Sequence, residues 1–201
     1  MSPCNCADEA AEIGQRRVLG MLLAINAAMF LVEFAVGWIG QSTGLIADAL
    51  DMLADAAVYG LALAAVGGAW QAKARAARIS GIAQIVLASG VILDVARRFV
   101  LGSEPVSALM MAMGLVALLA NLGCLLLLAR HRKGEVHMQA SWIFSRNDVL
   151  ANLGVMIGGG LVALSGSPLP DLVIGLGIAL LVMTGGIGII KAAKSTGSNP
   201  D

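Results

Sequence analysis

Hydrophobic residues fall in six long runs along the chain, and a short polar stretch separates each run from the next. The runs cover about residues 18–39, 43–70, 79–96, 106–129, 140–164 and 171–190. A helix of about 20 mostly apolar residues is long enough to cross the hydrocarbon core of a bilayer. The pattern therefore predicts an all-α membrane protein with six transmembrane helices.

The runs fit a single membrane domain over residues 16–194. We expect a flexible polar tail at 1–15 and a short polar tail at 195–201. The first run is too long for the hydrophobic part of a signal peptide, and it has no clear cleavage site. It also contains Asn26 and Glu33, so we interpret it as the first transmembrane helix.

Basic residues gather on one side of the predicted bundle. Six helices put both termini on the same side as the second–third and fourth–fifth loops, and that side holds 10 of the 13 Lys and Arg residues. The opposite side has Arg97 and Arg98, which nearby Glu104 offsets. Because cytoplasmic loops carry the excess of Lys and Arg, we expect a multi-pass protein of the inner (plasma) membrane with both termini in the cytoplasm.

Composition narrows the function classes. Charged residues make up 13% of the chain and hydrophobic residues 58%, whereas a soluble domain has about 25% charged residues. A net charge of +0 and 4% aromatic residues argue against nucleic acid as a partner. The three cysteines give no disulfide framework. Cys124 fits a small core residue, while Cys4 and Cys6 fit either capture of a soft metal or a disordered tail.

Three aspartates interrupt the second run, where an ionised Asp at mid-bilayer costs about 2.5–3.5 kcal/mol. Asp48, Asp51 and Asp55 follow an i, i+3, i+7 spacing. At about 100° per residue, they fall within roughly 60° of one another on one helix face. Like charges in such a stripe repel one another unless a cation or protons neutralise them. The stripe therefore indicates cation binding inside the membrane.

The fifth run carries a second polar group. Asp148 and Asn152 share a helix face, and Asn147 lies about 100° away from Asp148. If the second and fifth helices are neighbours, Asp51, Asp55 and Asp148 bring three carboxylates to one site. Carboxylate and amide oxygens suit a divalent cation. A hydrogen bond between helices is an equally open role for Asn152.

Both polar segments carry a family resemblance. The run from Gly44 to Asp55 resembles the second-helix signature of the cation diffusion facilitator family, with a small-residue turn, Leu-x-Ala-Asp-Ala, and a ligand pair spaced four apart. The segment 148–155 is similar to the fifth-helix signature, and Pro170-Asp171 is similar to the start of the sixth helix. The resemblance covers about residues 17–190 and implies a transporter rather than an enzyme.

The resemblance implies export of a divalent metal from the cytoplasm in exchange for protons, by alternating access. Position by position, it assigns the transport site to Asp51, Asp55 and Asp148. Family precedent puts Zn²⁺ first as cargo, with Cd²⁺ beside it. A site with oxygen ligands alone instead favours Mn²⁺, Fe²⁺ or Co²⁺. The metal would be cargo, so we expect no resident cofactor.

Two positions need comment beside the family's four-ligand pattern. The usual fourth ligand falls at Phe144, which cannot bind a metal, so Asn147, Asn152 or a water molecule would complete the shell. Asp48 matches an aspartate common to the family but outside its four-ligand set. We include it among the candidate metal-site residues, in an entry or structural role.

The end of the chain also departs from the pattern. Many family members continue into a soluble cytoplasmic metal-binding domain that aids dimerisation, whereas this chain ends 11 residues after the predicted sixth helix. We expect a homodimer held by the glycine-rich runs 154–158 and 185–188, although these glycines also suit packing within one protomer. His131 and His137 fit either a loop metal site or solvated interfacial histidines.

Two other classes compete with a transporter. Intramembrane aspartyl proteases share a proton between two aspartates and use a Gly-x-Gly-Asp motif. This chain has Gly175-Leu-Gly177 followed by Ile178 instead of Asp. A purely structural membrane protein would need no acidic residues aligned on one helix face.

Overall fold

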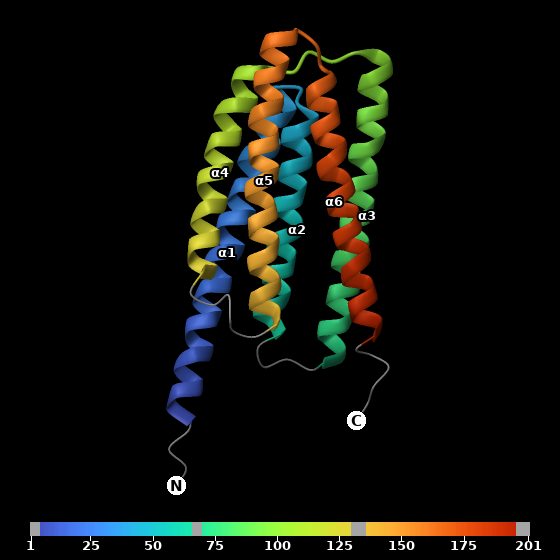
Figure 1. Cartoon of the computed structure of the whole chain (residues 1–201). Coiled ribbons are helices and arrows are strands. Elements are labelled where there is room, and N and C mark those ends of the chain that lie inside the picture. Colours follow the sequence, from blue (N-terminus) through green and yellow to red (C-terminus); the bar gives the residue numbers. More distant parts are fainter. Residues whose placement is uncertain (1–4, 66–69, 130–135, 196–201) are drawn as a thin grey trace.

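The computed structural model describes residues 5–65, 70–129 and 136–195 (Figure 1). Over these ranges the chain forms six helices, α1 (Asn5–Ile39), α2 (Thr43–Ala65), α3 (Trp70–Leu101), α4 (Ser107–Ala129), α5 (Val136–Ser165) and α6 (Leu169–Ser195). They run lengthwise in one bundle, with the start of α1 and the end of α6 at the same end. The prediction of an all-α membrane protein with six helices is confirmed.

Helix α2 lies inside the bundle. It contacts each of the other five helices, and residues 42–50 are all buried. The other five helices each contain a segment long and apolar enough to cross a membrane. Every 18-residue window within α2 includes its three aspartates, a charge content that lipid does not tolerate. The surrounding helices therefore hold the acidic segment away from lipid.

Helices α1, α3 and α6 are longer than the hydrophobic pattern suggested. Helix α1 includes residues 5–15, which we expected in a flexible tail, and α3 includes the basic residues 73–78, which we expected in a connection. Helix α6 continues to Ser195. All three extensions are rich in Ala, Glu, Lys or Arg, which are strong helix formers and carry a helix beyond its apolar part.

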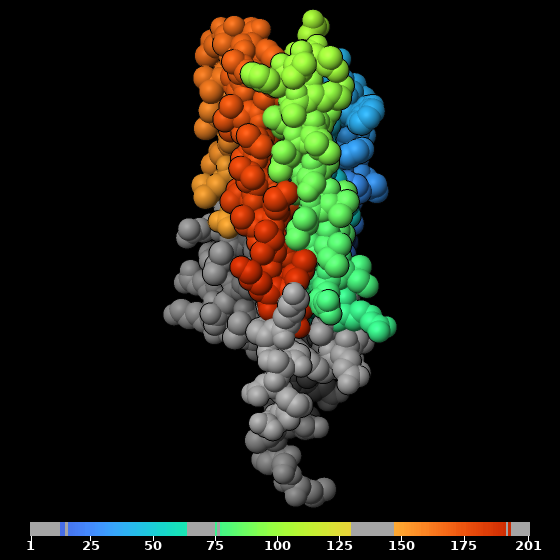
Figure 2. Space-filling view, turned by 90° about the vertical axis from the view of Figure 1, so that its right-hand side faces the viewer, coloured from blue at the N-terminus to red at the C-terminus, as the bar shows by residue number. Residues whose placement is uncertain are grey.

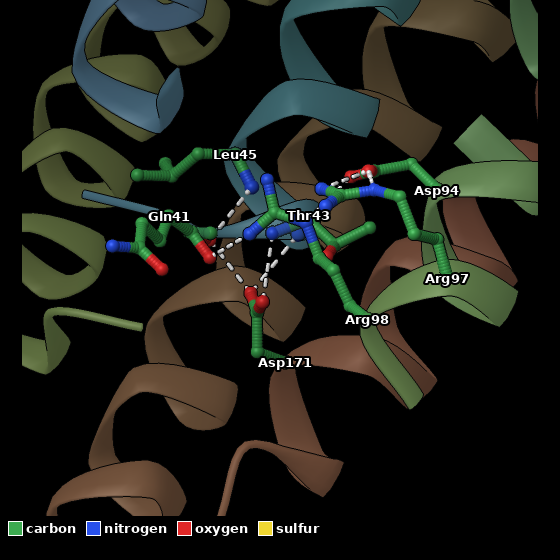
Figure 3. A network of polar contacts seen from close by, with 9 residues as sticks. Gln41, Thr43, Leu45, Asp94, Arg97, Arg98 and Asp171 are labelled. Atoms are coloured by element: carbon green, nitrogen blue, oxygen red, sulfur yellow. Dashed lines mark hydrogen bonds and ion pairs between the residues drawn. The ribbon is translucent and has the colours of Figure 1, made fainter. Parts of the chain in front are cut away.

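The connection between α1 and α2 is a tight turn. A carbon added at Gly37 would lie 2.9 Å from the Leu45 Cβ, so a side chain there would push the two helices apart. Gln41 takes a left-handed backbone with φ of 50°, which costs a residue other than glycine about 1–2 kcal/mol. Its carbonyl accepts a hydrogen bond from the Arg98 guanidinium of α3 (Figure 3).

Asp171 joins the start of α6 to the start of α2 (Figure 3). Its Oδ1 accepts hydrogen bonds from the Ser42 hydroxyl at 2.6 Å and the Gly44 N–H at 2.9 Å, and its Oδ2 accepts one from the Thr43 N–H at 2.7 Å. Ser42 also caps α2 by accepting the Leu45 N–H at 3.1 Å. A carboxylate is favoured here because helix N-termini offer free N–H groups and positive dipole ends. We call this arrangement the Asp171 clasp.

Arg97 and Arg98 both pair with Asp94 on the same helix. Asp94 Oδ1 lies 2.7 Å from Arg97 Nη2, and Asp94 Oδ2 lies 2.5 Å from Arg98 Nε. Both pairs follow the i, i+3 and i, i+4 spacing of neighbours on one helix face. The charge of the basic pair is thus partly neutralised within α3.

Candidate metal-transport site

A cavity of about 580 Å³ lies between α2, α3, α5 and α6. Its wall is formed by Asp51, Ala54, Asp55, Val58, Gln84, Asn147, Asp148, Ala151, Leu181, Val182, Thr184, Gly185, Gly188 and Ile189. On α2 and α5 these residues are near the middle of the helix, and on α6 they run from the middle toward the C-terminal end. The cavity therefore reaches from the middle of the bundle toward the end where α6 ends (Figure 1).

The three aspartates predicted as ligands all line this cavity. Asp51 is partly exposed, whereas Asp55 and Asp148 are each 8% exposed. The carboxyl groups of Asp55 and Asp148 are in hydrogen-bonding contact across the α2–α5 interface. Tyr59, one turn beyond Asp55, donates its hydroxyl to Asp55 Oδ2 at 3.3 Å. Helices α2 and α5 are thus neighbours, as the site requires.

The carboxylates line one wall but do not form a closed ligand set. Within the described ranges, no three His, Cys, Asp or Glu side chains converge closely enough to hold a metal ion. Three carboxylates that are all ionised would repel one another in this cavity, and a divalent cation would offset that repulsion.

Further polar side chains face the same space. Asn147 is exposed on the cavity wall, and Gln84 of α3 is 5% exposed there. Thr184 of α6 also lines the cavity and donates its hydroxyl to the Leu181 carbonyl at 2.9 Å. The sequence analysis missed Gln84, although an amide inside the third apolar run was a usable signal.

Asp48 and Asn152 lie outside the residues that line the cavity. Asn152 Nδ2 donates to Asp48 Oδ2 at 2.5 Å, and Asn121 Nδ2 of α4 donates to Asn152 Oδ1 at 3.0 Å. The structure thus gives Asn152 the role of joining helices. We therefore leave Asp48 and Asn152 out of the proposed ligand set.

Several candidate residues lie outside the described part of the molecule. These are the side chains of Phe144, Cys6 and His137, together with residues Cys4 and His131. The fourth-ligand position and the loop histidines therefore stay as predictions. Cys124 is a buried free cysteine in α4, in agreement with a core role, and Asn26 Nδ2 contacts its Sγ at 3.9 Å.

Comparisons with known proteins agree with the membrane-spanning fold. The family model for the cation efflux transmembrane domain matches residues 21–196. The zinc transporter ZitB of Escherichia coli (strain K12) is 27% identical over 204 residues, covering 94% of this chain and 65% of the relative. ZitB of Yersinia pestis is 24% identical over 184 residues, covering 84% of this chain and 58% of the relative.

The chain spans about three-fifths of the length of these curated relatives, in the range of 58% to 65%. The matched part contains the whole cavity. Apolar helices and the family match together describe a multi-pass protein of the inner membrane. Because the family model covers far more than half of its residues, the chain belongs to the cation efflux family.

Proposed function

We propose that the protein exports a divalent metal cation from the cytoplasm and that Asp51, Asp55 and Asp148 bind the cargo. The observation that carries this proposal is the presence of all three carboxylates on the wall of one cavity, between the buried helix α2 and helix α5. Hard oxygen ligands suit divalent cations. The names of the relatives support transport as the activity.

Zn²⁺ is the first cargo, because the relatives are named zinc transporters. Cd²⁺ is the second, since it has the same charge and similar ligands. The described polar groups of the cavity are carboxylate, amide and hydroxyl groups, which also accept Co²⁺, Fe²⁺ or Mn²⁺. Transport across a panel of these ions would rank them. The metal is cargo in every case, and the proposal includes no resident cofactor.

Metal export is coupled to proton entry through the same carboxylates. When the metal leaves, three ionised Asp side chains in a poorly solvated cavity repel one another, and protonation relieves this repulsion. Ligating carboxylates are deprotonated, so metal binding releases those protons. The protons belong to the cluster as a whole rather than to one Asp.

The proposal is tested by Zn²⁺ flux and proton flux in proteoliposomes. The wild-type protein should move Zn²⁺ only when protons move in the opposite direction. Asp55→Asn removes one ligand charge and should stop both fluxes, whereas Glu104→Gln, which changes an exposed carboxylate away from the cavity, should leave both unchanged. Equal Zn²⁺ flux in Asp55→Asn and wild type would refute the site.

We also propose that the protein acts as a homodimer. Its interface is formed by helix faces other than those on which Gly158 and Gly186 pack within the protomer. A carbon added at Gly158 would lie 3.2 Å from the Ile174 side chain, and one added at Gly186 would lie 2.8 Å from the Gly81 carbonyl oxygen, so both glycines pack within the protomer. Helices α3 and α6 are accordingly side by side along one face (Figure 2). A dimeric mass in nanodiscs is the expected result, and a monomeric mass would contradict it.

A further inference from the structure

Glu33 of α1 is fully buried and has no hydrogen-bond donor. Its exposed fraction is 0%, and neither carboxyl oxygen receives an N–H or O–H group. The carboxyl group of Asp48 on α2, itself 1% exposed, is in direct hydrogen-bonding contact with it. Two buried carboxylates in contact repel each other strongly unless a positive charge or a proton lies between them.

The neighbouring amide groups determine which of the two carboxyl groups carries the proton. Asn121 donates to the Asn152 carbonyl oxygen, so the amide group of Asn152 faces Asp48 and donates to it. Asp48 therefore already accepts one N–H group, which favours its charged form. Glu33 accepts none. The hydrogen atom that satisfies the pair thus lies on the Glu33 side and points to Asp48.

None of the described contacts brings a cationic side chain to the Glu33 and Asp48 carboxyl groups. The described ion pairs hold Arg97 and Arg98 on Asp94. Arg16, on the same helix as Glu33, is about 25 Å away along the axis at 1.5 Å per residue. The charged groups that act on the pair are Asp51 and Asp148, which are also carboxylates and add to the negative potential.

A metal ion does not fit the same position. The amide next to the pair is turned the wrong way for a metal ligand, because Asn152 faces Asp48 with its N–H group rather than with its oxygen, and a divalent cation binds oxygen ligands. Neither carboxyl lines the transport cavity. A proton needs one donor and one acceptor only, and the pair supplies both.

We infer that Glu33 and Asp48 form a proton-binding site separate from the metal cavity, in which a neutral Glu33 carboxyl donates its proton to the Asp48 carboxylate. The site joins α1 to α2 and continues through Asn152 and Asn121 to α5 and α4. Its proton stays bound while the cavity loads and releases metal. The inference rests on burial and contact geometry and does not depend on the proposed function.

Infrared difference spectroscopy on the purified full chain, in an ester-free detergent, tests this site directly. A protonated carboxyl gives a carbonyl stretching band that shifts in D₂O. We expect this band in the wild-type protein at alkaline pH and its loss in Glu33→Gln. The band should persist in Asp55→Asn, which changes the cavity but not the pair, so failure of the metal assignment would leave this result unchanged.

Thermal stability gives a second readout. Gln at position 33 keeps the shape of Glu and donates an N–H to Asp48, so Glu33→Gln should melt within a few degrees of the wild-type protein, while Glu33→Ala should melt clearly lower. Absence of the band in the wild-type protein would overturn the inference. Cation binding at the pair would also overturn it. In that case the melting temperature of the wild-type protein would rise with Na⁺ or Mg²⁺ at constant ionic strength, while that of Glu33→Gln would stay the same.

Discussion

The carboxylates of the cavity and the carboxylate of the Asp171 clasp lie at different places in the bundle and have opposite surroundings. Asp171 is 0% exposed and receives three hydrogen bonds at the N-terminus of α2. For Asp55, by contrast, the described donor is the Tyr59 hydroxyl, at the longer distance of 3.3 Å. A satisfied carboxylate stabilises the fold, whereas a poorly satisfied one remains available for a cation.

Helix α2 takes part in both the Asp171 clasp and the cavity. The first turn of α2 is fixed by Asp171 and by the N-cap of Ser42. Two to three turns later, Asp51 and Asp55 face a cavity. A fixed helix start holds these two residues at a defined position in the bundle, so that binding energy is spent on the metal and not on ordering the backbone.

The largest effect should come from removing one cavity carboxylate. Asp51→Ala, Asp55→Ala or Asp148→Ala should each reduce Zn²⁺ transport to background, because loss of a direct ligand costs more than the 10- to 100-fold, or about 1.4–2.7 kcal/mol, typical of an outer-shell change. The melting temperature should stay the same or rise, because repulsion falls. Transport assays and thermal unfolding of the same preparations test both statements. A variant that unfolds would place its Asp with the structural group instead.

Asp171→Ala should give the opposite pattern. It leaves the Ser42 hydroxyl and two backbone N–H groups without their acceptor, at about 1–3 kcal/mol for each buried group, so we expect a loss of stability of roughly 3 kcal/mol or more. Zn²⁺ affinity of the fraction that remains folded should be near the wild-type value. Thermal unfolding and binding at low temperature separate the two effects. A stable Asp171→Ala protein without Zn²⁺ binding would reverse the comparison.

The metal affinity of the cavity should depend on pH, with a fixed sign. Protons compete with the metal for the cavity carboxylates, so apparent affinity should fall as the pH falls, by about tenfold per pH unit, or about 1.4 kcal/mol, for each proton displaced. Titrations of purified protein between about pH 5.5 and 8 in weak buffer would measure affinity and proton release together. Affinity that is constant over this range, with no proton released, would indicate a uniporter.

Tyr59→Phe should have the smallest effect of these changes. It removes a single 3.3 Å hydrogen bond to Asp55 and keeps the buried ring. At about 1 kcal/mol for one hydrogen bond, Zn²⁺ affinity should fall by roughly fivefold. Isothermal titration of the two proteins is sufficient to detect this. An unchanged dissociation constant would mean that Tyr59 only fills space beside Asp55.

The hydrophobic pattern predicted six helices well, because lipid imposes long apolar segments and each segment must satisfy its own backbone. The positions of Asp51, Asp55 and Asp148 along their helices also predicted that the three carboxylates lie close together, and all three line one cavity. The pattern did not separate Asp48 from that group. A stripe 60° wide faces more than one neighbour, and helix packing decides which neighbour each side chain meets.

The partners of Asp48 show this limit in particular. Glu33 and Asn152 come from helices far apart in the sequence, and their contacts with Asp48 depend on how α1 and α5 pack around α2. Asp171 is a similar case, since its donors are 127 to 129 positions away. Local patterns identify polar residues in lipid-facing runs but do not show which of them are already satisfied.

X-ray absorption at the zinc edge, on protein loaded with one Zn²⁺ per chain, tests the ligand assignment most directly. Asp51, Asp55 and Asp148 supply oxygen, so the first shell should contain oxygen at about 2.0–2.2 Å. Sulfur at about 2.3 Å should be absent, and the signal should be lost in Asp55→Asn. A first shell with sulfur or imidazole, or a spectrum that Asp55→Asn leaves unchanged, would contradict the assignment of metal binding to these three aspartates.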